Sequence, residues 1–180
     1  MKVFEWIFIL LFSAACASSY PNLDPTGKYL PEVSGQSLSG QNWTFPKDIK
    51  EQKTLMFFAY DQDAQFDVDR WLIGIDQKKY KVNVFEVPTI KGWLPRIVSK
   101  QIDAGMRSGI PEDLWKIVVT LYGDAEKVLE LTGNENDLNA RVVVVDEDGK
   151  IVYFHDRGFS VAALNGLSKY FPSSLPSECL

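Results

Sequence analysis

The sequence predicts an α/β domain with a mostly parallel central sheet, an antiparallel C-terminal hairpin and helices on both faces. Three observations support this prediction. The stretch 54–60 (TLMFFAY) is a nearly continuous apolar run, which is typical of a central strand buried on both faces. Strand-like runs then alternate with helical periodicity over residues 61–133. Residues 141–154 have the pattern of two strands joined by a tight turn.

Residues 30–47 precede this core. They contain short extended pieces interrupted by glycine and proline, which predicts a lead-in β-hairpin. After the strand at 54–60, apolar residues recur with the spacing of one helix face, and Asp61 or Asp63 can act as the N-cap. The residues of that face are Val68, Trp71, Leu72 and Ile75.

The alternation then repeats along the chain. Residues 81–87 (KVNVFEV) predict a second strand, residues 115–122 (WKIVVTLY) a third, and residues 124–131 a short capped helix. Between the second and third strands, the sequence predicts an amphipathic helix that ends near Gly105. The apolar residues that predict it are Leu94, Ile97, Val98 and Ile102.

The last part of the domain closes the sheet. Strands at 141–146 and 150–154 flank an Asp-Gly turn, which is a strong hairpin signal. A final helix is expected to open at Ser160, to bury Val161, Leu164 and Phe171, and to stop at Pro172. We therefore expect one domain over residues 30–172, followed by a flexible tail at 173–180.

Residues 1–17 have the features of a signal peptide, with Lys2, a short apolar stretch and a run of small residues. Two processing routes remain open. Cleavage after Ala17 would release a soluble protein, whereas cleavage before Cys16 would leave that cysteine for lipid attachment. The residues before Cys16 resemble a bacterial lipobox, although Ser13 stands where leucine is usual.

We favour lipid attachment at Cys16, because the residues after it look like a lipoprotein tether. Residues 18–29 are polar, contain two prolines and a glycine, and are expected to form a linker. The protein is therefore expected to be exported to the periplasmic side of the cell envelope. It would be held at a membrane through its lipid if Cys16 is modified.

Composition excludes several kinds of function. The 19 basic and 24 acidic residues give a net charge of −5, with no block of like charges that would predict nucleic-acid binding. The two cysteines, Cys16 and Cys179, form no CxxC or zinc-ligand pattern. The one histidine, His155, has no candidate nucleophile near it in sequence, and we expect it to be a surface or half-buried residue.

Three segments together resemble the thioredoxin-like superfamily, in the form used by peroxiredoxins and membrane-tethered thioredoxins. They are the strand at 54–60, the hairpin at 142–152, and the closing glycine and helix at 158–167. Two stretches, 30–40 and 105–110, are similar to proteins of poorly defined function related to the mitochondrial ATP synthase assembly factor family. The resemblance spans most of the chain after the leader and implies a thioredoxin-like fold.

The resemblance also implies where redox residues would lie, and this chain lacks them. Gln62, Asp63, Ala64 and Gln65 occupy the CxxC positions, and Ala140 stands at the position of the cis-proline. Disulfide exchange needs a thiolate nucleophile, which glutamine cannot replace. We therefore expect no catalytic residue and no cofactor, and a role in binding or assembly with a protein partner in the envelope.

Two other functions stay open. Asp61, Asp63, Asp67 and Asp69 crowd the start of the first helix, where acidic residues also favour the helix dipole; we assign no metal to them. Arg107, beside Met106, is expected near the carboxyl ends of the strands, where it could bind a carboxylate or phosphate. An enzyme that uses the acidic cluster or Arg107 with a metal or anion is therefore one alternative.

A thiol redox partner that acts between molecules through Cys179 is the other alternative, although Cys179 is expected to lie in a mobile tail. The candidate binding surface combines the residues at the lost redox positions with the residues near the strand ends. Its members are Gln62, Gln65, Met106 and Arg107.

Overall fold

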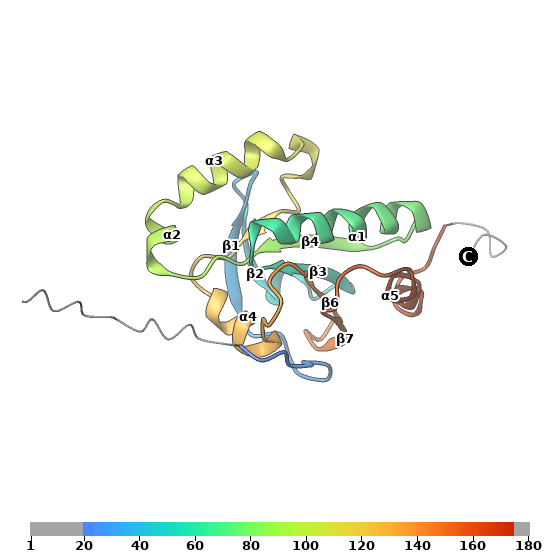
Figure 1. The fold of residues 1–180 in the computed structure, drawn as a ribbon. Helices are drawn as coiled ribbons and strands as arrows, with labels where there is room; N and C mark the ends of the chain where they lie inside the picture. The colour runs from blue at the N-terminus through green and yellow to red at the C-terminus, as the bar shows by residue number, and fades with distance from the viewer. Residues whose placement is uncertain (1–19, 175–180) are drawn as a thin grey trace, which may run out of the picture.

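The computed structural model describes residues 20–174 (Figure 1). In chain order the strands are β1 (Val33–Ser37), β2 (Asn42–Phe45), β3 (Thr54–Ala59), β4 (Asn83–Pro88), β5 (Val119–Thr120), β6 (Arg141–Val145) and β7 (Ile151–His155). The α-helices are α1 (Gln65–Lys78), α2 (Trp93–Ile97), α3 (Ser99–Gly109), α4 (Ala125–Thr132) and α5 (Val161–Gly166).

The strands form two hydrogen-bonded sheets, ordered β4-β3-β6-β7 and β2-β1-β5. Strand β3 is parallel to β4 and antiparallel to β6, and β6 and β7 form the predicted hairpin. Parallel bridges from Glu86 to Val118 and from Thr89 to Leu121 connect β4 with the segment around β5, so the two sheets adjoin. The arrangement is α/β as predicted, but more mixed than the expected mostly parallel sheet, because β6 pairs with the central strand β3 in the antiparallel direction.

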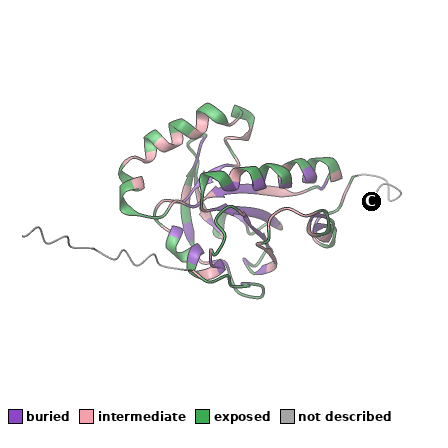
Figure 2. Cartoon of the chain, in the orientation of Figure 1, coloured by how far each residue is buried: buried purple, intermediate pink, exposed green. Residues whose placement is uncertain are grey.

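Helices cover both faces of the sheet, with α1 and α5 on one face and α4 on the other (Figure 2). The side chains of β3 and β6 alternate between the two resulting cores. Leu55, Phe57 and Val142 pack with Trp71 of α1 in one core. The other core contains Met56, Phe58, Val143, Val145 and Val128 of α4. Burial on both faces explains why these two strands are almost entirely apolar.

Helix α1 buries the face that the apolar spacing predicts. Val68 and Trp71 are fully buried, Ile75 is nearly so, and the residue that caps the end of the helix, Lys79, has the left-handed conformation. Asp61 accepts a hydrogen bond from the amide of Asp63, but it caps the short 3-10 turn that precedes α1 rather than α1 itself.

Three sequence predictions need correction. The helix expected from Leu94 to Gly105 is two helices, α2 and α3, neither of which buries a residue. The third strand, predicted over 115–122, is only two residues long, because residues 115–117 form a turn after the 3-10 helix at Glu112–Leu114. Val161 is exposed rather than buried, since α5 begins at this residue and packs through Leu164, three residues later.

The segment expected to be a linker lies along the domain from Tyr20 onward. The carbonyl of Tyr20 accepts from the amide of Asn134 at 2.7 Å, and the amide of Leu23 donates to Thr132 at 3.1 Å. Further along, the amide of Gly27 donates to the carbonyl of Ile151 at 2.8 Å. Across residues 20–174, no helix has both the length and the apolarity to cross a membrane.

Candidate functional site

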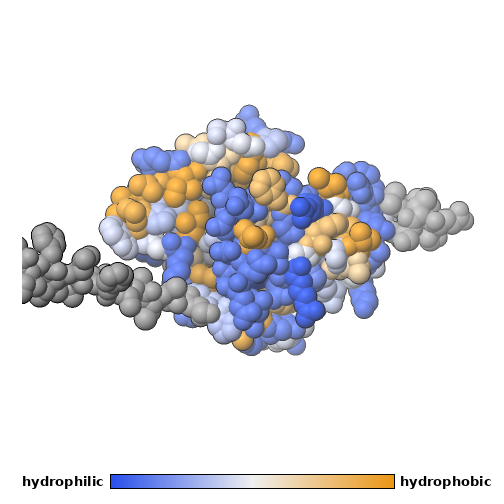
Figure 3. All heavy atoms as spheres, viewed as in Figure 1, coloured by the Kyte–Doolittle hydropathy of each residue, from blue (hydrophilic) through white to orange (hydrophobic). Residues whose placement is uncertain are grey.

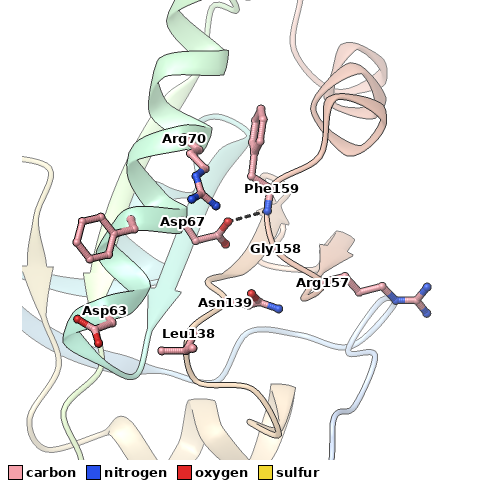
Figure 4. Close-up of a pocket in the computed structure, with 9 residues that line it drawn as sticks. Asp63, Asp67, Arg70, Leu138, Asn139, Arg157, Gly158 and Phe159 are labelled. Atoms are coloured by element: carbon pink, nitrogen blue, oxygen red, sulfur yellow. Dashed lines mark hydrogen bonds between the residues drawn. The ribbon is translucent and has the colours of Figure 1, made fainter.

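Three segments meet beside the first turns of α1 and enclose a pocket of about 450 Å³ (Figure 4). They are the start of α1 with the turn before it, the loop that leads into β6, and the loop between β7 and α5. The first two segments contain the positions that the resemblance assigns to the CxxC motif and to the cis-proline. The pocket is lined by Asp63, Phe66, Asp67, Arg70, Leu138, Asn139, Arg157, Gly158 and Phe159.

Asp67 joins the three walls of the pocket. Its side chain is buried, and its two carboxylate oxygens accept hydrogen bonds from two different loops. The amide of Ala140 donates to Oδ2 at 3.0 Å, and the amide of Phe159 donates to Oδ1 at 2.6 Å. Hydrogen bonds to a charged acceptor are stronger than neutral ones. One carboxylate therefore fixes both loops to α1.

Gly158 and His155 also hold the loop between β7 and α5 in place. Gly158 has a φ of +77°, a conformation that favours glycine, and a Cβ there would lie 3.0 Å from the Asn139 amide oxygen. The Nε2 atom of His155 lies 2.7 Å from the carbonyl of Gly158, and the imidazole packs edge-on against Trp71. His155 is partly buried and organises this loop.

Arg141 holds the loop before β6. Its side chain is fully buried and is paired with oxygen atoms of amides rather than with a carboxylate. Burial lowers the pKa of Arg141, and its guanidinium lies 5.7 Å from the ring centre of Tyr60. It donates to the carbonyls of Gly133, Asn136 and Asn139 and to the side-chain oxygens of Asn22 and Asn134.

The mouth of the pocket combines apolar and charged side chains. Phe66 is 67% exposed and Leu138 is 53% exposed, although both are large apolar residues that line the pocket. Arg70, Arg157 and Asp63 are exposed around them. Such a surface can take an apolar side chain of a partner between Phe66 and Leu138 and a carboxylate beside the arginines.

The sequence-predicted surface residues do not line this pocket. Gln65, in the first turn of α1, donates to Asp69 at 2.9 Å, and Gln62 is exposed in the preceding turn. Met106 and Arg107 lie in the last turns of α3, where the Arg107 side chain donates to the carbonyl of Leu38 at 2.8 Å. The segment 105–110 is mostly helical and contacts the turn between β1 and β2, so it is not part of the crevice.

The acidic residues around the start of α1 are engaged in separate interactions. Asp61 caps the 3-10 turn, Asp67 accepts from two amides, and Asp69 accepts from Gln65. Over the described range, no three His, Cys, Asp or Glu side chains are grouped so that they could hold a metal ion. Cys16 and Cys179 lie outside the described residues, so lipid attachment and intermolecular thiol chemistry stay predictions.

Sequence reasoning missed Glu86, which lies in the middle of β4. The side chain is only 3% exposed, and its Oε1 atom has no hydrogen-bond partner. Burial raises the pKa of this carboxyl to about 7; the Gln65 amide lowers it, and the Asp69 carboxylate raises it further. A glutamate inside a strand with apolar neighbours on both sides was the available sequence signal.

Glu86 should make the stability of the domain depend on pH. Its folded pKa of about 7 lies above the ordinary 4.5. The protonated Glu86 side chain therefore makes its full contribution to the free energy of unfolding below pH 4.5, and this contribution is lost as pH rises through about 7. We expect Glu86→Gln to be more stable than the wild type by about 3 kcal/mol near pH 8, and to differ little near pH 5. Urea unfolding at the two pH values measures this difference.

Asp76→Asn, at an exposed position of α1, is the matched control and should keep the wild-type pH dependence. A Glu86→Gln protein with the same pH dependence as the wild type would show that Glu86 does not titrate with a raised pKa.

Comparison with solved structures identifies a thioredoxin-like fold. The exposed lipoprotein thioredoxin of Streptococcus pneumoniae aligns with a TM-score of 0.54 and 16% identity, over 77% of this chain and 98% of the other. Yeast Sco1 with copper bound aligns with a TM-score of 0.56 and 13% identity, over 87% and 98%. The thioredoxin domain of a Bacteroides vulgatus thiol-disulfide oxidoreductase aligns with a TM-score of 0.51 and 19% identity, over 81% and 96%.

No protein-family model matches the sequence, and no curated protein sequence is significantly similar to it. At these identities the structural likeness concerns the fold alone. The pocket at the start of α1 is therefore interpreted from its own residues, because fold does not determine function.

Proposed function

We propose that this protein is a non-catalytic thioredoxin-like module of the cell envelope that binds an extended segment of a partner protein, in an assembly or chaperone-type role. The observation that carries the proposal is a pocket with two exposed apolar side chains, Phe66 and Leu138, at the place where the sequence has lost its redox motif. Among residues 20–174, which the structure describes, there is no cysteine, so none of the described side chains that line the pocket carries a thiol.

The side chains around the pocket define the partner's chemistry. Phe66 and Leu138 offer apolar surface to one large side chain of the partner, and burial of that surface would supply most of the affinity. Arg70 and Arg157 outnumber the exposed Asp63, since the charge of Asp67 is engaged by two amides. We therefore expect a segment with an aromatic or aliphatic residue next to an acidic one.

Export and a lipid at Cys16 complete the proposal. The signal-like residues 1–17 and the small residues before Cys16 support it. The thioredoxin-like proteins of similar fold include an exposed lipoprotein, which is compatible with a tethered form of this chain. The partner would then be another protein at the same membrane or in the space beside it.

Binding of selected peptides tests the proposal. Peptides selected on the purified protein from a random library should bind through Phe66 and Leu138, and Phe66→Ala should weaken binding by about tenfold, the cost of one aromatic contact. Fluorescence polarisation with labelled peptide measures the dissociation constant. Ile73→Ala is the matched control, because Ile73 is an exposed apolar residue of the same helix outside the pocket.

Two results would contradict the proposal. One is an affinity that neither Phe66→Ala nor Leu138→Ala changes, which would place the peptide elsewhere. The other is reduction of insulin disulfides or of peroxide by the purified protein, which would require thiol chemistry that the pocket lacks.

A further inference from the structure

Helix α2 presents an apolar surface that the domain does not cover. Trp93 is 73% exposed, Leu94 is 56% exposed and Ile97 is 69% exposed, and α2 has no buried residue. The space-filling view shows apolar side chains gathered at the end of the molecule where α2 lies (Figure 3). We call Trp93, Leu94 and Ile97 the α2 patch. A cluster of this kind on a protein surface is typical of an interaction site.

The segment that contains the α2 patch is basic, although the protein as a whole is acidic and Glu126 and Asp124 lie near Lys91 and Arg96. The stretch 89–102 contains Lys91, Arg96 and Lys100 and no Asp or Glu, in a chain of net charge −5. A hollow of about 220 Å³ beside Trp93 is lined by Lys91 and Arg96, and its one acid, Glu126, is paired with Lys91 at 3.1 Å. Tryptophan and aliphatic side chains with a basic rim are the composition that binds anionic membrane surfaces.

The chain enters the domain beside this patch. Tyr20 is the first described residue, and its hydroxyl accepts a hydrogen bond from Lys91 Nζ at 2.6 Å. Lys91 lies two residues before Trp93 in the sequence. Cys16 precedes Tyr20 by four residues, so their Cα atoms are separated by at most about 14 Å. A lipid on Cys16 would therefore enter a bilayer close to the α2 patch.

We propose that the α2 patch docks on the surface of an anionic phospholipid bilayer, with Arg96 and Lys100 against the head groups. This inference rests on the lipid anchor of the proposed function. The anchor and the patch form a two-signal attachment, in which an acyl chain is supplemented by a basic apolar surface. The two signals together fix the domain against the membrane, whereas a lipid alone would leave it free to rotate on its tether.

Fluorescence quenching by brominated phospholipids tests the docking. The full chain, expressed with its leader and purified in processed form, is placed in vesicles with and without anionic lipid. The emission of Trp93 is the difference between the wild type and Trp93→Phe, which removes the contribution of the other tryptophans. We expect most of the Trp93 emission to be lost with brominated acyl chains in anionic vesicles, and added salt to restore part of it.

Two variants make the result specific. Leu94→Asp combined with Ile97→Asp should abolish the quenching of Trp93, whereas Ile73→Asp, at an exposed apolar position of α1, should leave it unchanged. Trp93 emission that brominated lipid does not change in the wild type would overturn the proposal. The proposal would also be overturned if Trp93 became shielded from solvent only on addition of a protein, because the α2 patch would then be a protein interface.

The mass of the same purified sample separates failure of the docking from failure of the anchor. A chain that begins at an acylated Cys16 and shows no quenching rejects the docking and leaves the anchor in place. A chain that begins at Ser18 rejects the anchor. The docking is then tested by flotation of that soluble form with anionic vesicles. Flotation with the vesicles would support the docking, and its absence would reject the docking.

Discussion

Replacement of Arg141 by methionine is expected to destabilise the domain by about 3–5 kcal/mol, because several oxygen acceptors would lose a charged donor and each buried acceptor left without a partner costs about 1–3 kcal/mol. Methionine is similar in length but donates no hydrogen bond, so the oxygens that Arg141 now contacts would be left buried or would have to move. Urea unfolding followed by far-UV circular dichroism measures the change in the free energy of unfolding. The acceptors that lose their donor are those of Gly133, Asn136, Asn139, Asn22 and Asn134.

Arg141→Lys distinguishes the role of the charge from that of the hydrogen bonds. Lysine keeps the positive charge but donates from one nitrogen, so it cannot reach acceptors spread along a loop as a guanidinium does. We expect it to recover only part of the lost stability. Amide hydrogen exchange of residues 136–139 should accelerate in both variants. A loss below about 1 kcal/mol in Arg141→Met would contradict the role assigned to this residue.

Replacement of Asp67 by alanine is expected to cost about 3–4 kcal/mol, because the buried amide of Ala140 and the partly buried amide of Phe159 lose a charged acceptor. The pocket should open as well, since the same carboxylate fixes two of its walls to α1. Peptide affinity measured at a temperature where the variant stays folded should therefore fall together with the stability. Thermal and urea unfolding measure the first effect, and fluorescence polarisation measures the second.

Asp67→Asn is the informative second variant, because an amide keeps one acceptor oxygen and can hold one of the two loops. Its stability should lie between those of the wild type and Asp67→Ala. Asp69→Asn, at an exposed position two residues later, should change stability little. Equal losses in Asp67→Asn and Asp69→Asn would show that Asp67 has no special role.

The elements that the sequence predicted well are those with a clear apolar pattern. Strands β3 and β6 are buried at every position and apolar except at their first residues, Thr54 and Arg141, and α1 buries the residues spaced as one face. Helices α2 and α3 were predicted as one buried helix because their apolar spacing is helical. Spacing alone does not reveal whether a neighbouring layer covers that face, and here none of their residues is buried.

The residues that shape the pocket were harder to predict, because their partners are distant in sequence. Asp67 and Ala140 are 73 positions apart, and nothing in the local pattern links them. A signal was nevertheless present, because Asp67 lies four positions before the buried Trp71, on the buried face of α1. Arg141, followed by four valines in a strand buried on both faces, carried a similar signal of a charged group with internal partners.

The central claim is that the pocket at the lost redox site binds an extended protein segment. Titration of the isotopically labelled protein with a selected peptide, followed by amide chemical shifts, tests it most directly. We predict that the largest shifts cluster at residues 63–70, 138–140 and 157–159 and leave the α2 patch unchanged. Shifts centred on Trp93, Leu94 and Ile97, or on any surface away from the pocket, would contradict the claim.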